Sequence, residues 1–233
     1  DVLGAVNVKT RATEYLGDTW HFIDCPGSVE LAQEARNALL TADTAVVVCE
    51  PSPERAMTMA ALFKFLDEHD IPHMVFINKM DNAAVPVTDV LEALQLASPR
   101  PLVLRQIPIA EGDDVTGYVD LVSERAYKYK PGEASEIISI PESLADEHSF
   151  AREQMLESLA DFDIEMMEKL LEDTIPPTQE IYQQLTKDLR ERLIVPVFFG
   201  SAENENGVRR LLKALRHETP SPDETAMRYG IDS

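Results

Sequence analysis

The sequence predicts an α/β fold, a mostly parallel sheet flanked by helices, with an inserted α+β subdomain. Continuous apolar runs at residues 44–49, 73–78 and 193–202 are typical of strands that are buried on both faces. Segments with apolar residues at helical spacing follow these runs along the chain. Because strand and helix alternate, crossover connections and a parallel sheet are expected.

The elements before and between the buried strands are a hairpin and three helices. Residues 6–15 and 19–24 mix β-branched and polar residues around a turn at 16–18, where Gly17 supplies a permissive backbone. Helical spacing of apolar residues predicts the helices. They are expected at residues 29–43, 53–70 and 87–97.

The alternation breaks near Ser98 and resumes at Leu193. Residues 102–109 and 117–129 look like strands of a more exposed kind, and helices are expected from 141 to 173 and from 177. A terminal helix is expected at 206–217. We therefore expect a core made of residues 1–104 and 193–233, and an inserted acidic subdomain of residues 105–192, the size of a small domain.

Charge and cysteine usage exclude several classes of function. The net charge is −21, and residues 133–180 hold 14 acidic and 2 basic residues, a net charge of −12. Such a segment repels phosphate backbones, so direct sequence-specific DNA binding is not expected. A solvated helical face and a surface for a basic partner both fit it. No apolar run approaches the roughly 20 residues that span a bilayer. Two cysteines at strand ends indicate a reducing, cytoplasmic compartment.

The first candidate site is "DCPG" at residues 24–27, after an apolar run. Asp24 can hold a cation directly or through water, and Gly27 lets a backbone N–H approach an anion at the start of the next helix. D-x-x-G is common and most instances are plain turns. Alone, the motif is weak evidence for a ligand site.

The second candidate site is "NKMD" at residues 78–81, which follows a buried strand. The carboxylate of Asp81 can accept hydrogen bonds from the ring N–H and the exocyclic amine of guanine, and adenine offers neither donor there. The stem of Lys79 can lie along the base, while the Asn78 amide bonds the base edge and ties neighbouring loops. The alternative is a surface loop in which Asp81 caps a helix.

The third candidate site is "GSAENENGV" at residues 200–208. A turn of small residues lets a backbone N–H, that of Ala202, reach the carbonyl oxygen of guanine. An ordinary strand-to-helix turn explains this stretch equally well when it is taken alone. Its position as the third such loop favours a site.

In this order the three motifs resemble a GTP-binding domain, most closely the first domain of bacterial elongation factor G. "DCPGSVEL", "FINKMD" and "GSAENENGV" are similar to that family's motifs, and "TGYVDLVSERAYKY" is similar to the opening of its inserted subdomain. The resemblance implies a P-loop-NTPase-like fold, GTPase activity, GTP or GDP and Mg²⁺ as ligands, and action on the ribosome. It implies contact with the large-subunit GTPase centre, and with the stalk protein through the acidic insertion.

The resemblance also implies roles for individual residues. Asp24 would organise Mg²⁺ through water and Gly27 would contact the γ-phosphate. The residues that would read guanine are Asn78, Lys79, Asp81, Ser201 and Ala202.

Two departures from the family pattern stand out. The sequence has no G-x-x-x-x-G-K-[ST], and Gly112 and Gly117 match its glycine spacing by coincidence. The family's phosphate loop would lie upstream of Asp1, so we expect a fragment or a processed chain that binds GTP weakly and is inactive alone. Ser28 stands where the family has a water-orienting histidine, and losing such a group costs about 10²–10⁴ in rate. A serine there is also a good helix cap.

Three hypotheses follow from these residues. The first is the GTPase domain of a ribosome-acting factor. The second is a GTP-dependent binding switch whose hydrolysis is slow or lost because of Ser28. The third is an interaction domain that no longer uses nucleotide.

Overall fold

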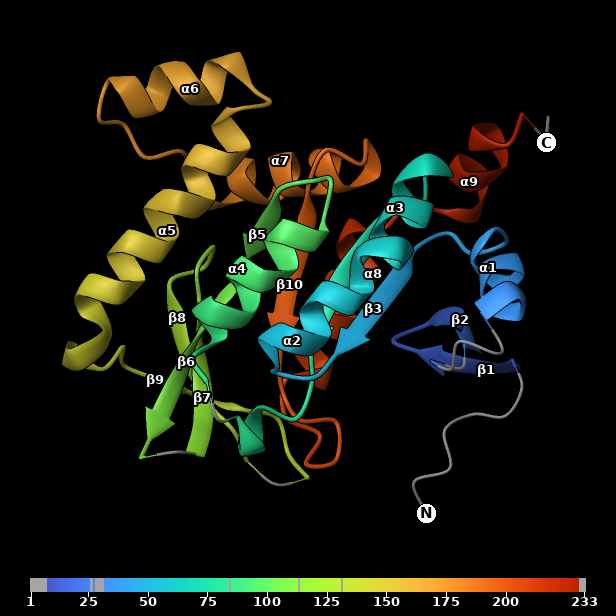
Figure 1. Ribbon diagram of the computed structural model, residues 1–233. Coiled ribbons are helices and arrows are strands. Elements are labelled where there is room, and N and C mark those ends of the chain that lie inside the picture. Colours follow the sequence, from blue (N-terminus) through green and yellow to red (C-terminus); the bar gives the residue numbers. More distant parts are fainter. Residues whose placement is uncertain are drawn as a thin grey trace.

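The computed structural model describes residues 8–25, 27, 32–83, 85–112, 114–130 and 132–230. Its centre is a four-stranded parallel sheet in the order β3-β4-β10-β5, with helices on both faces (Figure 1). The strands are β3 (Ala45–Cys49), β4 (His73–Ile77), β5 (Leu102–Leu104) and β10 (Val195–Phe199). The predicted α/β fold with a parallel sheet is confirmed.

Every residue of the two central strands β4 and β10 is buried, which explains why their sequences show no polar alternation. Successive side chains along each of these strands point to opposite faces of the sheet and pack into different hydrophobic clusters. Val75 and Val197 pack with the helices of one face, whereas Phe76 and Phe198 pack with α8 on the other. The helices of this core are α1 (Ala32–Leu39), α2 (Pro53–Ala56), α3 (Ala60–Glu68), α4 (Val87–Ala97), α8 (Val208–Glu218) and α9 (Pro222–Arg228). A 3₁₀ turn, η2 (Met57–Met59), divides the helix that was expected over residues 53–70.

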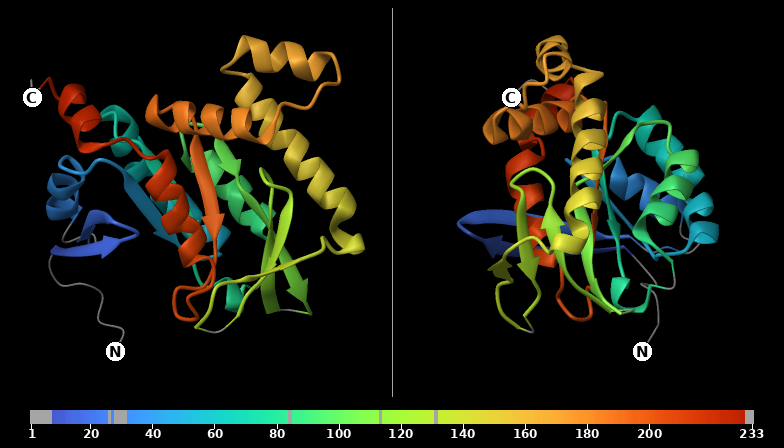
Figure 2. Two further views of the ribbon diagram at one scale, coloured as in Figure 1. Left: turned by 180° about the vertical axis from the view of Figure 1, so that it is seen from behind. Right: turned by 90° about the vertical axis from the view of Figure 1, so that its left-hand side faces the viewer.

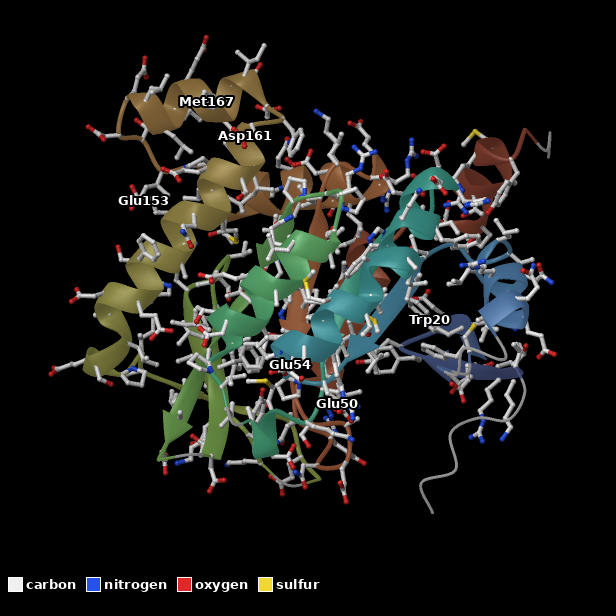
Figure 3. All side chains as sticks on the ribbon, in the orientation of Figure 1. Trp20, Glu50, Glu54, Glu153, Asp161 and Met167 are labelled. Carbon is white, nitrogen blue, oxygen red and sulfur yellow. The ribbon has the colours of Figure 1, made fainter. Side chains whose placement is uncertain are left out.

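The predicted hairpin is confirmed as β1 (Lys9–Tyr15) and β2 (Asp18–Asp24). Leu16 and Gly17 have φ angles of 51° and 86°, the conformation of a two-residue type I′ turn. The hairpin forms a two-stranded sheet of its own, and within the described residues no strand pairing joins it to β3. Trp20 packs against the side of the core that holds α8, and Arg216 of α8 lies 2.6 Å from Asp18 (Figure 3).

The region between β5 and β10 forms an antiparallel sheet in the order β6-β7-β8-β9, with helices against it (Figure 2). Leu156 of α5 and Leu185 of α7 pack on Ile107, Val119 and Leu121, all of them buried. The expectation of more exposed strands is therefore wrong for this face, because two helices cover it. The elements are β6 (Gln106–Glu111), β7 (Asp114–Asp120), β8 (Arg125–Lys128), β9 (Glu136–Ile138), η4 (Glu142–Leu144), α5 (Ala145–Ala160), α6 (Ile164–Leu171) and α7 (Thr178–Arg190).

The helical region expected over residues 141–173 is divided between α5 and α6. Asp163 has an extended backbone, and its carboxylate accepts a hydrogen bond from the Met166 amide at 2.9 Å. This is an N-cap, so Asp163 starts a new helix instead of continuing the first. No helix within the described ranges combines the length and apolar character that crossing a bilayer requires.

Four buried charges join the core to the inserted sheet. Arg105, which follows β5, donates two hydrogen bonds to Glu218 at the end of α8, at 2.6 and 3.1 Å. Arg210 of α8 donates to Asp120 of β7 at 2.8 Å. Asp120 also accepts from the backbone amides after β7, and the two arginines hold the pKa of its carboxyl below the usual range despite burial. These pairs fix α8 against both sheets.

Asp188 of α7 predicts a pH dependence of stability. Its side chain is fully buried, Oδ1 accepts a hydrogen bond from Gln184 at 2.8 Å, and burial raises the pKa of the carboxyl to about 7. Between about pH 4 and 7 the folded state holds a proton that the unfolded state has released. The contribution of Asp188 to the free energy of unfolding is therefore greatest below about pH 4, and it is lost as the pH rises through 7.

We expect Asp188→Asn to be nearly neutral at about pH 3.5 and to stabilise the chain at pH 8 by about 1.4 kcal/mol or more, the equivalent of one pKa unit. Thermal unfolding of both proteins at the two pH values measures this. Glu157→Gln changes an exposed carboxylate on α5 and serves as the control. Equal effects of Asp188→Asn at both pH values would contradict the assignment.

Candidate functional site

The N-K-x-D turn follows β4 and is tied to the strands on either side. The backbone N–H of Asn78 donates to the Cys49 carbonyl at 2.8 Å, and the backbone N–H of Met80 donates to the Gly200 carbonyl at 3.0 Å. Lys79 has a φ of 62°, an uncommon conformation for a residue with a side chain. Asp81 lies in a 3₁₀ turn, η3 (Met80–Asn82). The turn therefore has a defined shape at the carboxyl end of the sheet, where open parallel sheets bind ligands.

The G-S-A loop follows β10 and folds back on itself. Ser201 and Asn206 exchange backbone hydrogen bonds of 3.0 and 2.9 Å. A Cβ added to Gly200 would lie 2.1 Å from the Asn206 carbonyl oxygen, and Gly207 has a φ of 77°. Both glycines are required by this close approach and this backbone conformation.

The two loops are joined by side chains. The Ala202 amide donates to Oδ1 of Asn78 at 2.8 Å. The amide nitrogen of Asn204 donates to Oδ2 of Asp81 at 3.3 Å and to the Ser201 hydroxyl at 3.1 Å. Asn78, Asp81, Ser201 and Ala202 therefore meet at one edge of the sheet. Sequence reasoning missed Asn204, although its place within the same loop as Ala202 was a usable signal.

Lys79 is held by a carboxylate that the sequence analysis also missed. Its ammonium lies 2.5 Å from Glu50, the residue after β3, and Arg55 lies at the same distance from the other oxygen of Glu50. The hydrogen bond from Lys79, followed by the charge of Arg55, lowers the pKa of this partly exposed carboxyl. Glu50 therefore stays ionised and holds the end of the lysine beside the turn.

The first motif lies apart from this cluster. Asp24 is exposed at the end of β2, in the separate hairpin sheet, and an atom added to Gly27 would meet nothing within 4 Å. Ser28 lies outside the described residues. A single exposed carboxylate fits Mg²⁺, which keeps several waters and takes one or two carboxylates together with phosphate oxygens. Within the described ranges no three His, Cys, Asp or Glu side chains gather around one point.

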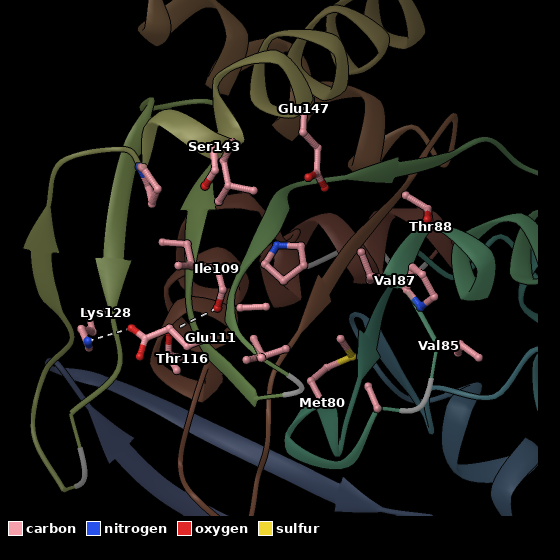
Figure 4. A pocket seen from close by; sticks show the side chains of 18 of the residues that line it. Met80, Val85, Val87, Thr88, Ile109, Glu111, Thr116, Lys128, Ser143 and Glu147 are labelled. Carbon is pink, nitrogen blue, oxygen red and sulfur yellow. Dashed lines mark hydrogen bonds and ion pairs between the residues drawn. The ribbon is translucent and has the colours of Figure 1, made fainter.

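A cavity of about 660 Å³ lies where Met80 of the N-K-x-D turn meets the antiparallel sheet of β6 to β9 (Figure 4). Its lining is mainly apolar and includes Val87 and Ile109, with a Lys128–Glu111 ion pair of 3.0 Å at its edge. Apolar walls do not match a nucleotide phosphate, and Asn78, Asp81 and Ala202 do not line it. The cavity is therefore separate from the cluster of polar loops.

Comparison with known proteins places this arrangement in a family. The model of the elongation factor Tu GTP binding domain matches residues 5–221. An "Elongation factor G-like protein" of Synechocystis is 47% identical over 98% of the chain and 34% of its own length. "Elongation factor G" of Thermotoga maritima is 31% identical over 93% of the chain and 32% of its own length.

A solved structure from Thermus thermophilus agrees in fold. It superposes with a TM-score of 0.78 and 27% identity, over 97% of this chain and 34% of its own. The chain spans about a third of the length of these relatives. The predicted resemblance to elongation factor G is confirmed. The chain therefore belongs to the elongation factor Tu GTP-binding domain family.

Proposed function

We propose that the N-K-x-D and G-S-A loops bind the base of GTP and GDP, with Asn78, Lys79, Asp81, Ser201 and Ala202 as its contacts. The observation that carries this proposal is the hydrogen bond from the Ala202 amide to Asn78, which draws together loops more than 120 residues apart. Two fixed loops present a carboxylate, an amide and a backbone N–H to one region, as the recognition of a planar polar base requires.

Asn204 supports the same reading. Its NH₂ group donates to the carboxylate of Asp81, and the exocyclic amine of guanine is a donor of the same kind. We propose that guanine takes over these hydrogen bonds, with Asn204 moving aside as the base enters. The Ala202 amide would then share its hydrogen between Asn78 and the guanine carbonyl. Competition among GTP, ATP and xanthosine triphosphate for the full-length protein measures the selectivity directly.

We further propose that the full-length protein hydrolyses GTP with Mg²⁺. Asp24 would hold the ion through water, and Gly27 would approach the γ-phosphate through its backbone. Bound Mg²⁺ neutralises the charge that develops on the phosphoryl oxygens. The exposure of Asp24 and the open space around Gly27 agree with these roles.

We propose that residues 105–192 form the inserted subdomain and bind a basic partner, the stalk protein of the large ribosomal subunit, near the GTPase centre in the cytoplasm. Glu153 and Asp161 are exposed on α5 and at its end, at the periphery of the molecule (Figure 3). The two basic residues of the −12 segment are both engaged. Arg152 donates to backbone carbonyls after β7, and Lys169 pairs with Glu180. The remaining carboxylates would meet a positively charged surface.

The alternative is a switch that binds GTP and hydrolyses it slowly because Ser28 cannot orient water as a histidine does. We expect Ser28→His to raise ribosome-stimulated GTP hydrolysis by the full-length protein, by up to about 10²–10⁴-fold if no other group compensates. Single-turnover rates with and without ribosomes measure it, and Ser28→Ala is the control. If the unmodified protein and Ser28→His both hydrolyse GTP rapidly and at equal rates, the switch alternative fails and the GTPase stands.

A further inference from the structure

A second cleft, of about 440 Å³, lies between the inserted sheet and the start of α8. One wall carries Tyr118, Tyr127 and Tyr129, with the first two rings stacked at a centroid distance of 5.0 Å. The other wall carries Asn206, Gly207 and the first two turns of α8. The left view of Figure 2 shows α8 in red and the inserted strands in green on this side. The volume is in the range of small-molecule sites, about 300–1,000 Å³.

The lining of this cleft is rich in cations, although the chain has twice as many acidic as basic residues. Three of these cations, Arg125, Arg209 and Lys213, are exposed, and in the described part of the chain none has a carboxylate within ion-pair distance. Lys130 also lines the cleft, paired with Glu136 at 3.1 Å. Unpaired like charges around one space repel each other, and an anion between them relieves that repulsion.

Arg210 supplies a buried donor to the same cleft. Its side chain is 8% exposed, and Nε donates to Asp120. Its Nη2 is buried and has no hydrogen-bond partner among the described residues, and the same holds for the hydroxyl of Tyr129. Burial raises the pKa of Tyr129, so the phenol keeps its proton and remains a donor. Buried donors of this kind favour a ligand that accepts hydrogen bonds.

The backbone at the start of α8 also favours an anion in the cleft. Gly207 is the N-cap of α8, so no side chain accepts from the amides of the first turn. These amides form the positive end of the helix dipole, which favours an anion. The carboxylates that line the cleft are the buried Asp120, which Arg210 neutralises, and the exposed Glu133 and Glu205. Cations outnumber them.

We propose that this cleft binds a small phosphate ester with an aromatic group, its phosphate held by Arg209, Lys213 and Arg125 and its ring against the tyrosines. Phosphate is favoured over a carboxylate because a dianion can engage several cations at once, and guanidinium groups bind its oxygens in pairs. The site is distinct from the base site. The two adjoin, because Glu205 and Asn206 belong to the loop that holds Ser201 and Ala202.

The test is calorimetric titration of the chain with phenyl phosphate at about 0.15 M salt, without nucleotide. We expect saturable binding of one equivalent, and at least a 10-fold loss of affinity in Arg209→Ala/Lys213→Ala. The matched control is Lys9→Ala/Arg11→Ala, which removes the same charges from the exposed strand β1 and is expected to leave binding unchanged. Circular dichroism establishes that both variants are folded.

Four outcomes would overturn the proposal. They are no binding of phenyl phosphate by the unmodified chain, equal losses in the two double variants, benzoate binding as tightly as phenyl phosphate, and a tetraglutamate peptide binding more tightly than either. The last would assign the cleft to an acidic protein segment. Neither Asp81 nor Ala202 lines the cleft, so failure of base recognition leaves this test unaffected.

Discussion

Replacing Asp81 by asparagine is expected to lower the affinity of the full-length protein for GTP by about 10²–10⁴-fold and to raise its affinity for xanthosine triphosphate. Two hydrogen bonds from guanine to the carboxylate would be lost, and each bond to a charged group is worth about 1.5–3 kcal/mol. Xanthine offers a carbonyl oxygen where guanine has its amine, and an asparagine NH₂ can donate to it.

Competition binding with GTP, xanthosine triphosphate and ATP measures this change of preference. Asp89→Asn is the matched control, because it makes the same substitution at an exposed position of α4 a few residues away. A preference for GTP that survives Asp81→Asn would show that another group reads the base. It would leave the fold and the family assignment untouched.

Replacing Arg105 by alanine is expected to destabilise the chain by about 3–5 kcal/mol, since it leaves the Glu218 carboxylate buried without its bidentate partner. Arg105 is fully buried and also joins the sheets through its backbone, donating to Val197 of β10 and accepting from Leu121. For a chain of this size, such a loss lowers Tm by roughly 6–20 °C.

Thermal unfolding tests this prediction, with Arg100→Ala as the matched control. Arg100 pairs with Asp67 at 2.5 Å, but the pair is partly exposed, so its loss is expected to cost about 0–1 kcal/mol. The double variant Arg105→Met/Glu218→Leu is expected to recover much of the stability, because it removes both buried charges. Equal effects of Arg105→Ala and Arg100→Ala would mean that burial adds nothing to the importance of the first pair.

Most of the core was predictable because its signals are local. The continuous apolar runs of β4 and β10 identify strands buried on both faces, and Gly17 identifies the hairpin turn. The division of helices was harder to predict. Asp163 caps a new helix inside an acidic run, and the S-P-D-E sequence from Ser221 forms a capping box that begins α9. Both signals are present in the sequence but resemble its many other acidic residues.

The burial of the inserted strands was not predictable from their sequences. Their polar residues suggested exposure, but Gln106 and Asp120 are buried, and Asp120 has the charge of Arg210 beside it. A polar residue can be buried when a partner elsewhere in the chain satisfies it. Arg210 lies 90 residues away from Asp120 in the chain, so no local sequence pattern indicates the pair.

The sequence by itself determined the family, the parallel sheet and the residues that the N-K-x-D and G-S-A loops carry, because these depend on short motifs and on the period of apolar residues. Only the tertiary structure decided which loops meet. Strand β10 pairs with β4, which joins Asn78 to Ala202 and brings Asn204 to Asp81, whereas Asp24 stays in the separate hairpin sheet. Contacts across more than 120 residues arise from strand pairing and close packing, which no stretch of sequence specifies alone.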